Sequence, residues 1–304
     1  MSVKSLKYFT FLSMILFYFN CNDEINEPDS SPVAGYTQID FEPSVTNDNT
    51  KIVYVHSNVD FELTGIYIYD LLTNSNSLFK NGFIRSPDWS PDSKWIVYSL
   101  SNNLYKIKSN GDSLTILTNL ANSGNNMHPK WSEDGSKIAF ANTDCSSSDQ
   151  CGVYTMNTDG SEITLIEPNA IYPEWTDNGN ALFFLKQIKN TNGQPAGDSL
   201  FKYSLTNNLK ELITVFSGNE HILNSYLNST GNDIIFCSTS ETGFSYVYKY
   251  NLLSGSLTKL SQTQGYSPFA SDFSEKTVYT NRDQGNGRLC IMNNDGSYPV
   301  QITP

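Results

Sequence analysis

The chain has 304 residues, with 19 Lys and Arg against 31 Asp and Glu, 18 Tyr and 17 Phe, and a formal net charge of −12. This length accommodates a single large β domain, and the aromatic content excludes a disordered chain. The negative charge argues against nucleic acid or an anionic membrane surface as a partner, because the sequence holds no basic stripe to neutralise phosphates.

The first 20 residues have the pattern of a signal peptide. Lys4 and Lys7 precede an apolar run over 8–19, which is followed by Asn20 and Cys21. The run of about 12 residues is too short to cross roughly 30 Å of hydrocarbon as a helix, which favours cleavage over an uncleaved anchor. A cysteine directly after such a run resembles a bacterial lipoprotein, and this resemblance implies that Cys21 is lipidated and becomes the new N-terminus. The alternative is ordinary cleavage with an incidental Cys21.

An acidic segment follows the cysteine. Residues 22–27 read NDEINE, which is similar to the tag that directs some lipoproteins of the Bacteroidetes to the outer face of the outer membrane. We therefore expect residues 21–34 to be a lipidated cysteine and a flexible acidic tether, because they hold too few apolar side chains to fold. The predicted location is the outer membrane, and the periplasmic and surface-exposed faces both remain open.

The remaining residues, 35–304, contain a repeat of about 45 residues. The stretch HPKWSEDGSKIAF at 128–140 sets the pattern of a proline, a tryptophan two residues later, a polar turn and an apolar run. In the turn, a short acceptor such as Asp134 can bond to the backbone two residues on. Six copies align on the proline column, which reads Pro43, Pro87, Pro129, Pro173, Ser225 and Pro268.

Each copy predicts four short strands. The apolar run after the polar turn suits a strand buried on both faces. The next strand carries an aromatic residue in register at Tyr67, Tyr105, Tyr154, Phe201 and Tyr248, with Cys290 in the last copy. A short fourth strand follows a turn such as NTDGS at 157–161. One such sheet cannot bury both faces, so the sequence predicts an all-β, six-bladed β-propeller with four antiparallel strands per blade.

The repeats resemble the TolB-type β-propeller, whose hallmark is Pro-x-Trp-Ser-Pro-Asp-Gly followed by a Lys-Ile-Ala-Phe-like strand. The segments 87–98 (PDWSPDSKWIVY) and 129–140 (PKWSEDGSKIAF) carry this resemblance. The last copy ends with a fourth strand of its own at 300–303. For closure of the ring we therefore weigh plain packing between blades against a latch formed by residues 36–39 along one edge.

Four cysteines fall in or between the predicted strands. Cys145 and Cys151 bracket the polar loop CSSSDQC, and in an exported protein we expect them to form a disulfide. A zinc site is the weaker alternative, because two thiolates do not complete a zinc shell. Cys237 and Cys290 fall inside strands and are expected to be buried thiols.

The candidate binding site is the mouth of the central funnel, where ligands of propellers usually bind. The residue before the proline column is expected to face this mouth in each copy. These residues are Glu42, Ser86, His128, Tyr172, Asn224 and Ser267. Arg85 and His221 lie just upstream in the same loops, and His56 begins a neighbouring loop. Such a set could bind a small polar ligand or a metal, or could simply be solvated loops.

We interpret the chain as a non-catalytic binding or assembly platform at the cell envelope, for a protein or a glycan partner. Its many tyrosines suit either partner. No catalytic residue, metal ligand or cofactor is predicted for this function, and the oligomeric state stays open. The alternative is an extracellular polysaccharide-acting enzyme with a divalent metal near His128 and His221, because some acidic-sugar lyases are built on related propellers. A third candidate, an accessory to a serine peptidase, would need a catalytic domain from elsewhere.

Overall fold

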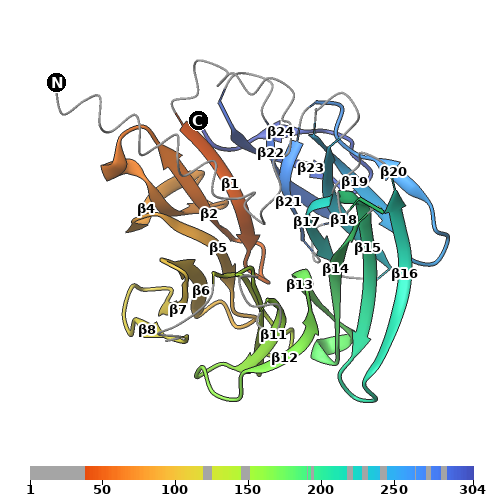
Figure 1. Ribbon diagram of the computed structural model, residues 1–304. Helices are drawn as coiled ribbons and strands as arrows, with labels where there is room; N and C mark the ends of the chain where they lie inside the picture. The colour runs from red at the N-terminus through yellow and green to blue at the C-terminus, as the bar shows by residue number, and fades with distance from the viewer. Residues whose placement is uncertain are drawn as a thin grey trace, which may run out of the picture.

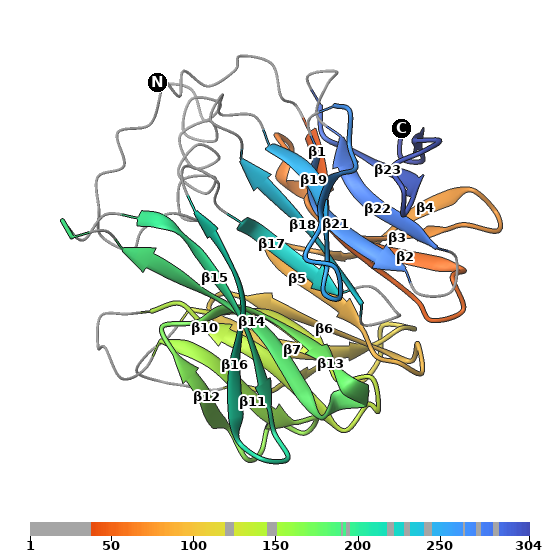
Figure 2. The ribbon, with the colours of Figure 1, turned by 90° about the vertical axis from the view of Figure 1, so that its right-hand side faces the viewer.

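The computed structural model describes residues 38–118, 125–144, 151–189, 191–192, 195–217, 222–227, 232–239, 245–263, 265–271, 275–281 and 286–304. The described residues form six four-stranded antiparallel sheets arranged as blades around a central axis (Figure 1). Viewed from the side, neighbouring sheets pack face to face (Figure 2). The prediction of a six-bladed propeller is therefore confirmed.

In every blade the four strands follow one another in chain order from the axis outwards. The first blade comprises β1 (Gln38–Val45), β2 (Lys51–Asn58), β3 (Gly65–Asp70) and β4 (Ser75–Asn81). The second comprises β5 (Ile84–Trp89), β6 (Trp95–Leu100), β7 (Asn103–Lys108) and β8 (Thr115–Ile116). The third comprises β9 (Asn126–Trp131), β10 (Lys137–Asn142), β11 (Gly152–Asn157) and β12 (Thr164–Pro168).

The other three blades repeat this order. The fourth comprises β13 (Ile171–Thr176), β14 (Ala181–Lys189), β15 (Pro195–Ser204) and β16 (Leu209–Ser217). The fifth comprises β17 (Ile222–Leu227), β18 (Asp233–Thr239), β19 (Ser245–Asn251) and β20 (Leu257–Lys259). The sixth comprises β21 (Gly265–Ser271), β22 (Lys276–Asn281), β23 (Arg288–Asn293) and β24 (Val300–Gln301). Two short 3₁₀ helices, η1 (Phe61–Leu63) and η2 (Asp177–Gly179), lie in connections.

The polar turn of the repeat is built by one serine and one aspartate. In the third blade, Ser132 Oγ accepts from Lys137 N at 2.9 Å and donates to Asp134 Oδ1 at 2.6 Å. The same carboxylate oxygen accepts from Ser136 N at 3.0 Å, and these hydrogen bonds hold the pKa of Asp134 below its usual value. Asp48 and Asp92 make the corresponding bonds in the first two blades. The predicted role of the turn acceptor is thus confirmed in these three copies.

The apolar cores lie between the blades. Six buried clusters each combine side chains of two neighbouring sheets, and the cluster of Val53 and Val55 with Tyr98 and Ile107 joins the first two blades. The predicted aromatic column pairs across β2–β3 and its equivalents, as in Phe140 opposite Tyr154 with ring centroids 5.4 Å apart. In the last blade Tyr279 stands opposite Cys290, as the register predicted. Each blade buries its apolar faces only against its two neighbours, so the stability of a blade depends on its place in the ring.

The turn glycine of the third blade fits closely against the second blade. Gly160 has φ +87°, and a Cβ atom there would lie 2.5 Å from the carbonyl oxygen of Leu117. Gly111 has nearly the same φ, +89°, but a Cβ atom there would meet nothing within 4 Å. A comparison of substitutions at the two positions therefore distinguishes the effect of backbone strain from the effect of contact between blades.

We expect Gly160→Ala to lower the free energy of unfolding by about 2 kcal/mol more than Gly111→Ala. Both substitutions place a side chain in the left-handed region, at about 1 kcal/mol each, and only Gly160→Ala forces the two blades apart. Urea unfolding followed by tryptophan fluorescence measures the difference. Equal losses of unfolding free energy for the two variants would show that the turn at Gly160 does not pack against the neighbouring blade.

The ring closes between the first and last blades, without a shared strand. Ile39 forms a single parallel bridge with Gly287, and Asp40 N donates to Gly287 O at 3.0 Å. The Asp40 side chain is 2% exposed and accepts from Thr303 Oγ1 at 2.6 Å. Of the latch considered over residues 36–39, the structure describes Gln38 and Ile39, and Ile39 forms the bridge to the last blade. Tyr36 and Thr37 lie outside the described residues.

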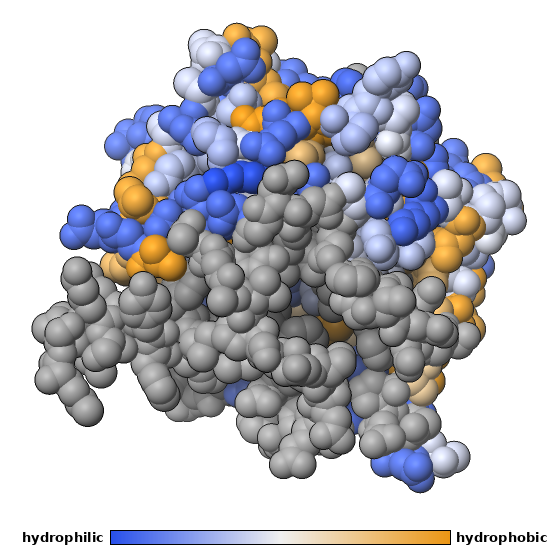
Figure 3. Space-filling model, turned by 90° about the horizontal axis from the view of Figure 1, so that it is seen from above, coloured by the Kyte–Doolittle hydropathy of each residue, from blue (hydrophilic) through white to orange (hydrophobic). Residues whose placement is uncertain are grey.

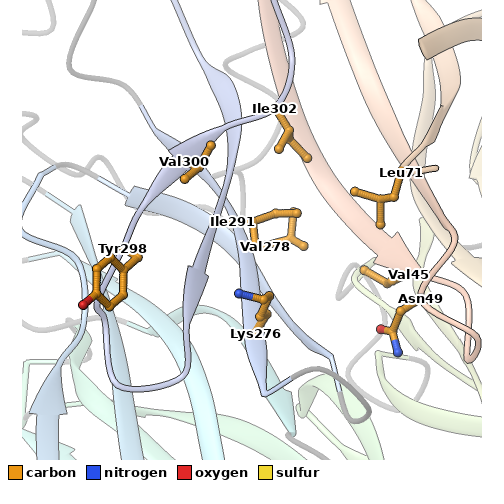
Figure 4. A pocket seen from close by; sticks show the side chains of 9 residues that line it. All are labelled: Val45, Asn49, Leu71, Lys276, Val278, Ile291, Tyr298, Val300 and Ile302. Carbon is orange, nitrogen blue, oxygen red and sulfur yellow. The ribbon is translucent and has the colours of Figure 1, made fainter. Parts of the chain in front are cut away.

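A cavity of about 410 Å³ opens at this seam (Figure 4). Val45 and Leu71 of the first blade face Val278, Ile291 and Ile302 of the last blade across it. Its lining is mainly apolar, so the cavity is a gap in the packing between two blades rather than a polar binding site.

The predicted signal peptide and tether, residues 1–34, lie outside the described residues. Within the described part of the chain, no helix has the length and apolar character needed to cross a membrane.

Candidate functional site

A bulge in the innermost strand of each blade shapes the central channel. The pairing of the first and second strands shifts register beside the proline column, for example between Phe41 and Ser44. In the first four blades the residue before the proline adopts the left-handed region, with φ of 51° at Glu42, 49° at Ser86, 52° at His128 and 53° at Tyr172. Such values cost energy for residues with a Cβ atom, and clusters of them occur at functional sites.

Glu42 and Arg85 form a paired charge at the channel. Arg85 donates from its NH2 group to Glu42 Oε1 at 2.9 Å and from Nε to Oε2 at 3.2 Å, and Ser86 N donates to Oε2 at 2.6 Å. Burial opposes ionisation of Glu42, but the charge and hydrogen bonds of Arg85 outweigh it and hold the pKa of Glu42 below its usual value. The Arg85 guanidinium also lies 4.6 Å from the ring centroid of Phe41.

His128 continues this chain of contacts around the axis. Its Nδ1 lies 3.2 Å from Ser86 Oγ, and its ring centroid is 4.7 Å from that of Tyr172. Burial lowers the pKa of His128 to about 4, although the nearby Glu42 carboxylate opposes the change. Burial likewise raises the pKa of Tyr172. Both rings are therefore neutral at pH 7, and the only charges in this set are Glu42 and Arg85.

A second charged set lies two residues further along the innermost strands. Lys130 Nζ is 3.8 Å from Asp88 Oδ1 and 3.6 Å from Glu174 Oε1. Asp88 also accepts from Ser44 Oγ at 3.0 Å and from Trp131 N at 2.9 Å. Burial raises the pKa of Asp88, and burial with the neighbouring Asp88 charge raises the pKa of Glu174 to about 8 against the attraction of Lys130. Two carboxyl groups thus compete for one ammonium group.

The structure brings five of the predicted funnel residues together, namely Glu42, Arg85, Ser86, His128 and Tyr172. They are more enclosed than solvated loops would be, since Glu42 is 4% and His128 9% exposed. Whether they bind a ligand stays a prediction.

Three of the other predicted funnel residues have side chains outside the described residues. Asn224 lies in β17, where it pairs with Cys237, but its side chain is outside the described residues, as is that of Ser267. His221 lies wholly outside them. His56 instead belongs to the seam, where its Nδ1 is 2.6 Å from Asp40 Oδ1.

Cys237 and Cys290 are buried, as predicted, and Cys237 Sγ donates to the carbonyl oxygen of Gly265 at 3.1 Å. Cys151 is buried and disulfide-bonded, whereas Cys145 lies outside the described residues, so the pairing of these two cysteines stays a prediction. Among the described residues, no group of three or more His, Cys, Asp or Glu side chains is placed to hold a metal ion.

Sequence reasoning missed the set of Asp88, Lys130 and Glu174. A signal was present, because the position after the proline column holds Ser44, Asp88, Lys130 and Glu174 in consecutive copies. Charged side chains in register on innermost strands must meet near the axis, where burial is expected.

The geometry defines the class as a closed six-bladed β-propeller whose innermost strands carry buried polar and charged side chains. The family model PD40, described as the TolB beta propeller domain, matches residues 28–220. The chain therefore belongs to the TolB β-propeller family, and the resemblance found in the repeats is confirmed.

A curated relative is the Tol-Pal system protein TolB of Francisella tularensis subsp. mediasiatica, 26% identical over 83% of this chain and 60% of that protein. The chain thus spans about 60% of the length of this relative. Among solved structures, TolB of Acinetobacter baumannii superposes with a TM-score of 0.64 at 19% identity, covering 88% of this chain and 64% of that chain. Oligogalacturonate lyase in complex with manganese gives 0.58 at 12% identity, covering 83% and 76%. At these identities the structures show a shared fold alone.

Proposed function

We propose that this propeller is a non-catalytic binding platform of the bacterial cell envelope, held at the outer membrane by a lipid on Cys21. Membership of the TolB β-propeller family supports a role at the envelope, since the curated relatives are named as proteins of the Tol-Pal system. That name also favours a protein over a glycan as the partner. The negative net charge fits a partner that is not nucleic acid.

The observation that carries the proposal is that the channel groups bond to one another. The carboxylate of Glu42 is held by Arg85 and by Ser86 N. Ser86 and His128 lie at the distance of a nucleophile and its base, but a pKa of about 4 makes His128 a weak base at neutral pH. This arrangement supports recognition over chemistry at the channel mouth.

The alternative function, a metal-dependent lyase, is tested by measuring metal binding. We expect the melting temperature of the full chain to be unchanged by Mn²⁺ or Ca²⁺, with or without oligogalacturonate. A metal-dependent lyase would instead be stabilised by about 2.7 kcal/mol at a metal concentration one hundred times the dissociation constant. His128→Ala would abolish that shift, whereas His56→Ala, at the seam, would leave it in place. Such a pattern would replace the platform with the enzyme.

The partner is tested by site-specific photocrosslinking in the native host. A photoreactive residue is placed at Ser101, in the exposed turn between β6 and β7, and as a control at Leu253, in the turn between β19 and β20 at the opposite rim. We expect a protein of the outer membrane to crosslink from position 101 and not from position 253. Crosslinks that are equal at both positions would contradict a partner at the channel rim. No crosslink, together with stabilisation by oligosaccharides, would identify a glycan partner.

A further inference from the structure

The first blade presents an apolar patch on the rim of the propeller. It consists of Val59, Phe61 and Leu63 in the β2–β3 connection and Phe83 in the β4–β5 connection, which are 38–47% exposed. The rings of Phe61 and Phe83 lie 4.7 Å apart between centroids, so the two connections form one surface. In the view from above, hydrophobic surface appears as separate areas among hydrophilic side chains (Figure 3). We call these four residues the apolar rim patch.

Hydrogen bonds hold the backbone of this patch in place. Asn81 Nδ2 lies within 3.1 Å of the carbonyl oxygens of Phe61, Glu62 and Thr64. Asp60 Oδ1 accepts from Glu62 N at 3.1 Å and so caps the 3₁₀ helix η1. A loop fixed by its own side chains presents its apolar residues at little cost in conformational entropy, which is what a docking surface requires.

The position of the patch indicates what it contacts. Asn58, the last residue of β2, pairs with Gln38, where the described part of β1 begins. The preceding part of the chain therefore enters the propeller beside the patch. It contains the apolar run at 8–19 and Cys21, and residues 22–37 between Cys21 and β1 can span at most about 55 Å when fully extended. A lipid on Cys21 would hold the patch close to a bilayer.

We propose that the apolar rim patch docks onto the lipid bilayer that carries the anchor, with Phe61 and Phe83 at the level of the headgroups. This inference rests on the lipid anchor of the proposed function. Aromatic side chains favour the interfacial region, and lipid anchoring is strengthened by a second contact. Asp60 and Glu62 flank Phe61, so the contact favours zwitterionic over anionic lipid.

The test uses the full chain with its native N-terminus, reconstituted in phosphatidylcholine vesicles. An environment-sensitive dye is attached at Phe61→Cys, at Phe83→Cys, or at Leu72→Cys as the control. Leu72 is 76% exposed in the turn between β3 and β4, at the rim opposite the patch. The Cys237 and Cys290 side chains are buried, so they do not compete for the dye. We expect a several-fold rise in fluorescence with a blue shift at positions 61 and 83 but not at 72, weakened when phosphatidylglycerol is added.

Flotation of the same vesicles separates the two proposals. A chain that floats while the dyes at 61 and 83 behave like the dye at 72 overturns membrane docking but retains the anchor, and assigns the patch to a protein contact. A chain that does not float overturns the anchor, and the docking that rests on it. Agreement between the independent loops at 61 and 83 guards against a local effect of either substitution.

Discussion

Asp40→Ala is expected to lower the free energy of unfolding by about 3 kcal/mol, the cost of breaking a buried charged contact. The Asp40 carboxylate joins the two ends of the ring, because it lies in the first strand and accepts from Thr303 at the end of the chain. It also contacts His56 Nδ1 at 2.6 Å, and Arg288 NH1 lies 3.7 Å away. Replacing Asp40 by alanine leaves these groups without their shared acceptor. The loss falls at the seam between the first and last blades, which no covalent connection joins.

The measurement is the midpoint of urea unfolding, with Asp70→Ala as the control at an exposed turn. A second pair isolates the seam. Thr303 and Thr118 hydroxyls accept from Leu289 N and Leu104 N in equivalent places. Thr303 donates to the Asp40 carboxylate at 2.6 Å, whereas Thr118 donates to the neutral Asn103 Oδ1 at 3.3 Å. Thr303→Val should therefore cost about 1 kcal/mol more than Thr118→Val. If Asp40→Ala costs no more than Asp70→Ala, and Thr303→Val no more than Thr118→Val, the carboxylate does not close the ring.

Glu174→Gln is expected to stabilise the protein above pH 8 and to leave it unchanged near pH 5. The pKa of Glu174 is raised to about 8 in the folded state, from 4.5 in the unfolded chain. Between these values the folded state binds one more proton than the unfolded state, so stability falls as the pH rises. The full effect is up to about 4 kcal/mol and is complete just above pH 8. A neutral glutamine of the same shape removes this loss.

The free energy of unfolding, measured from pH 5 to pH 9, checks this prediction. The wild type should become less stable than Glu174→Gln as the pH rises, while Glu211→Gln, at an exposed site on β16, should follow the wild type. If the unfolding free energies of the wild type and Glu174→Gln change with pH in the same way, Lys130 stabilises the charges of Glu174 and Asp88 together.

The repeat made the fold predictable at the level of single residues. The Ser132 and Asp134 turn, the second strands and the aromatic residue opposite the second strand in the first five blades follow from local chemistry, and they appear where the spacing placed them. The site was predictable only in part. The register predicted that Glu42, His128 and Tyr172 face the axis. It did not predict their left-handed backbone or the hydrogen bond from Arg85 to Glu42.

The sequence by itself determined the number of blades, the strand order within each blade and the family, because every copy repeats interactions between residues close in the chain. Only the tertiary structure decided how the copies interact. The competition of Asp88 and Glu174 for Lys130, the low pKa of His128 and the closure of the ring through Asp40 and Thr303 join residues 42 to 263 positions apart. Those contacts depend on burial and on the curvature of the ring, which no local pattern specifies.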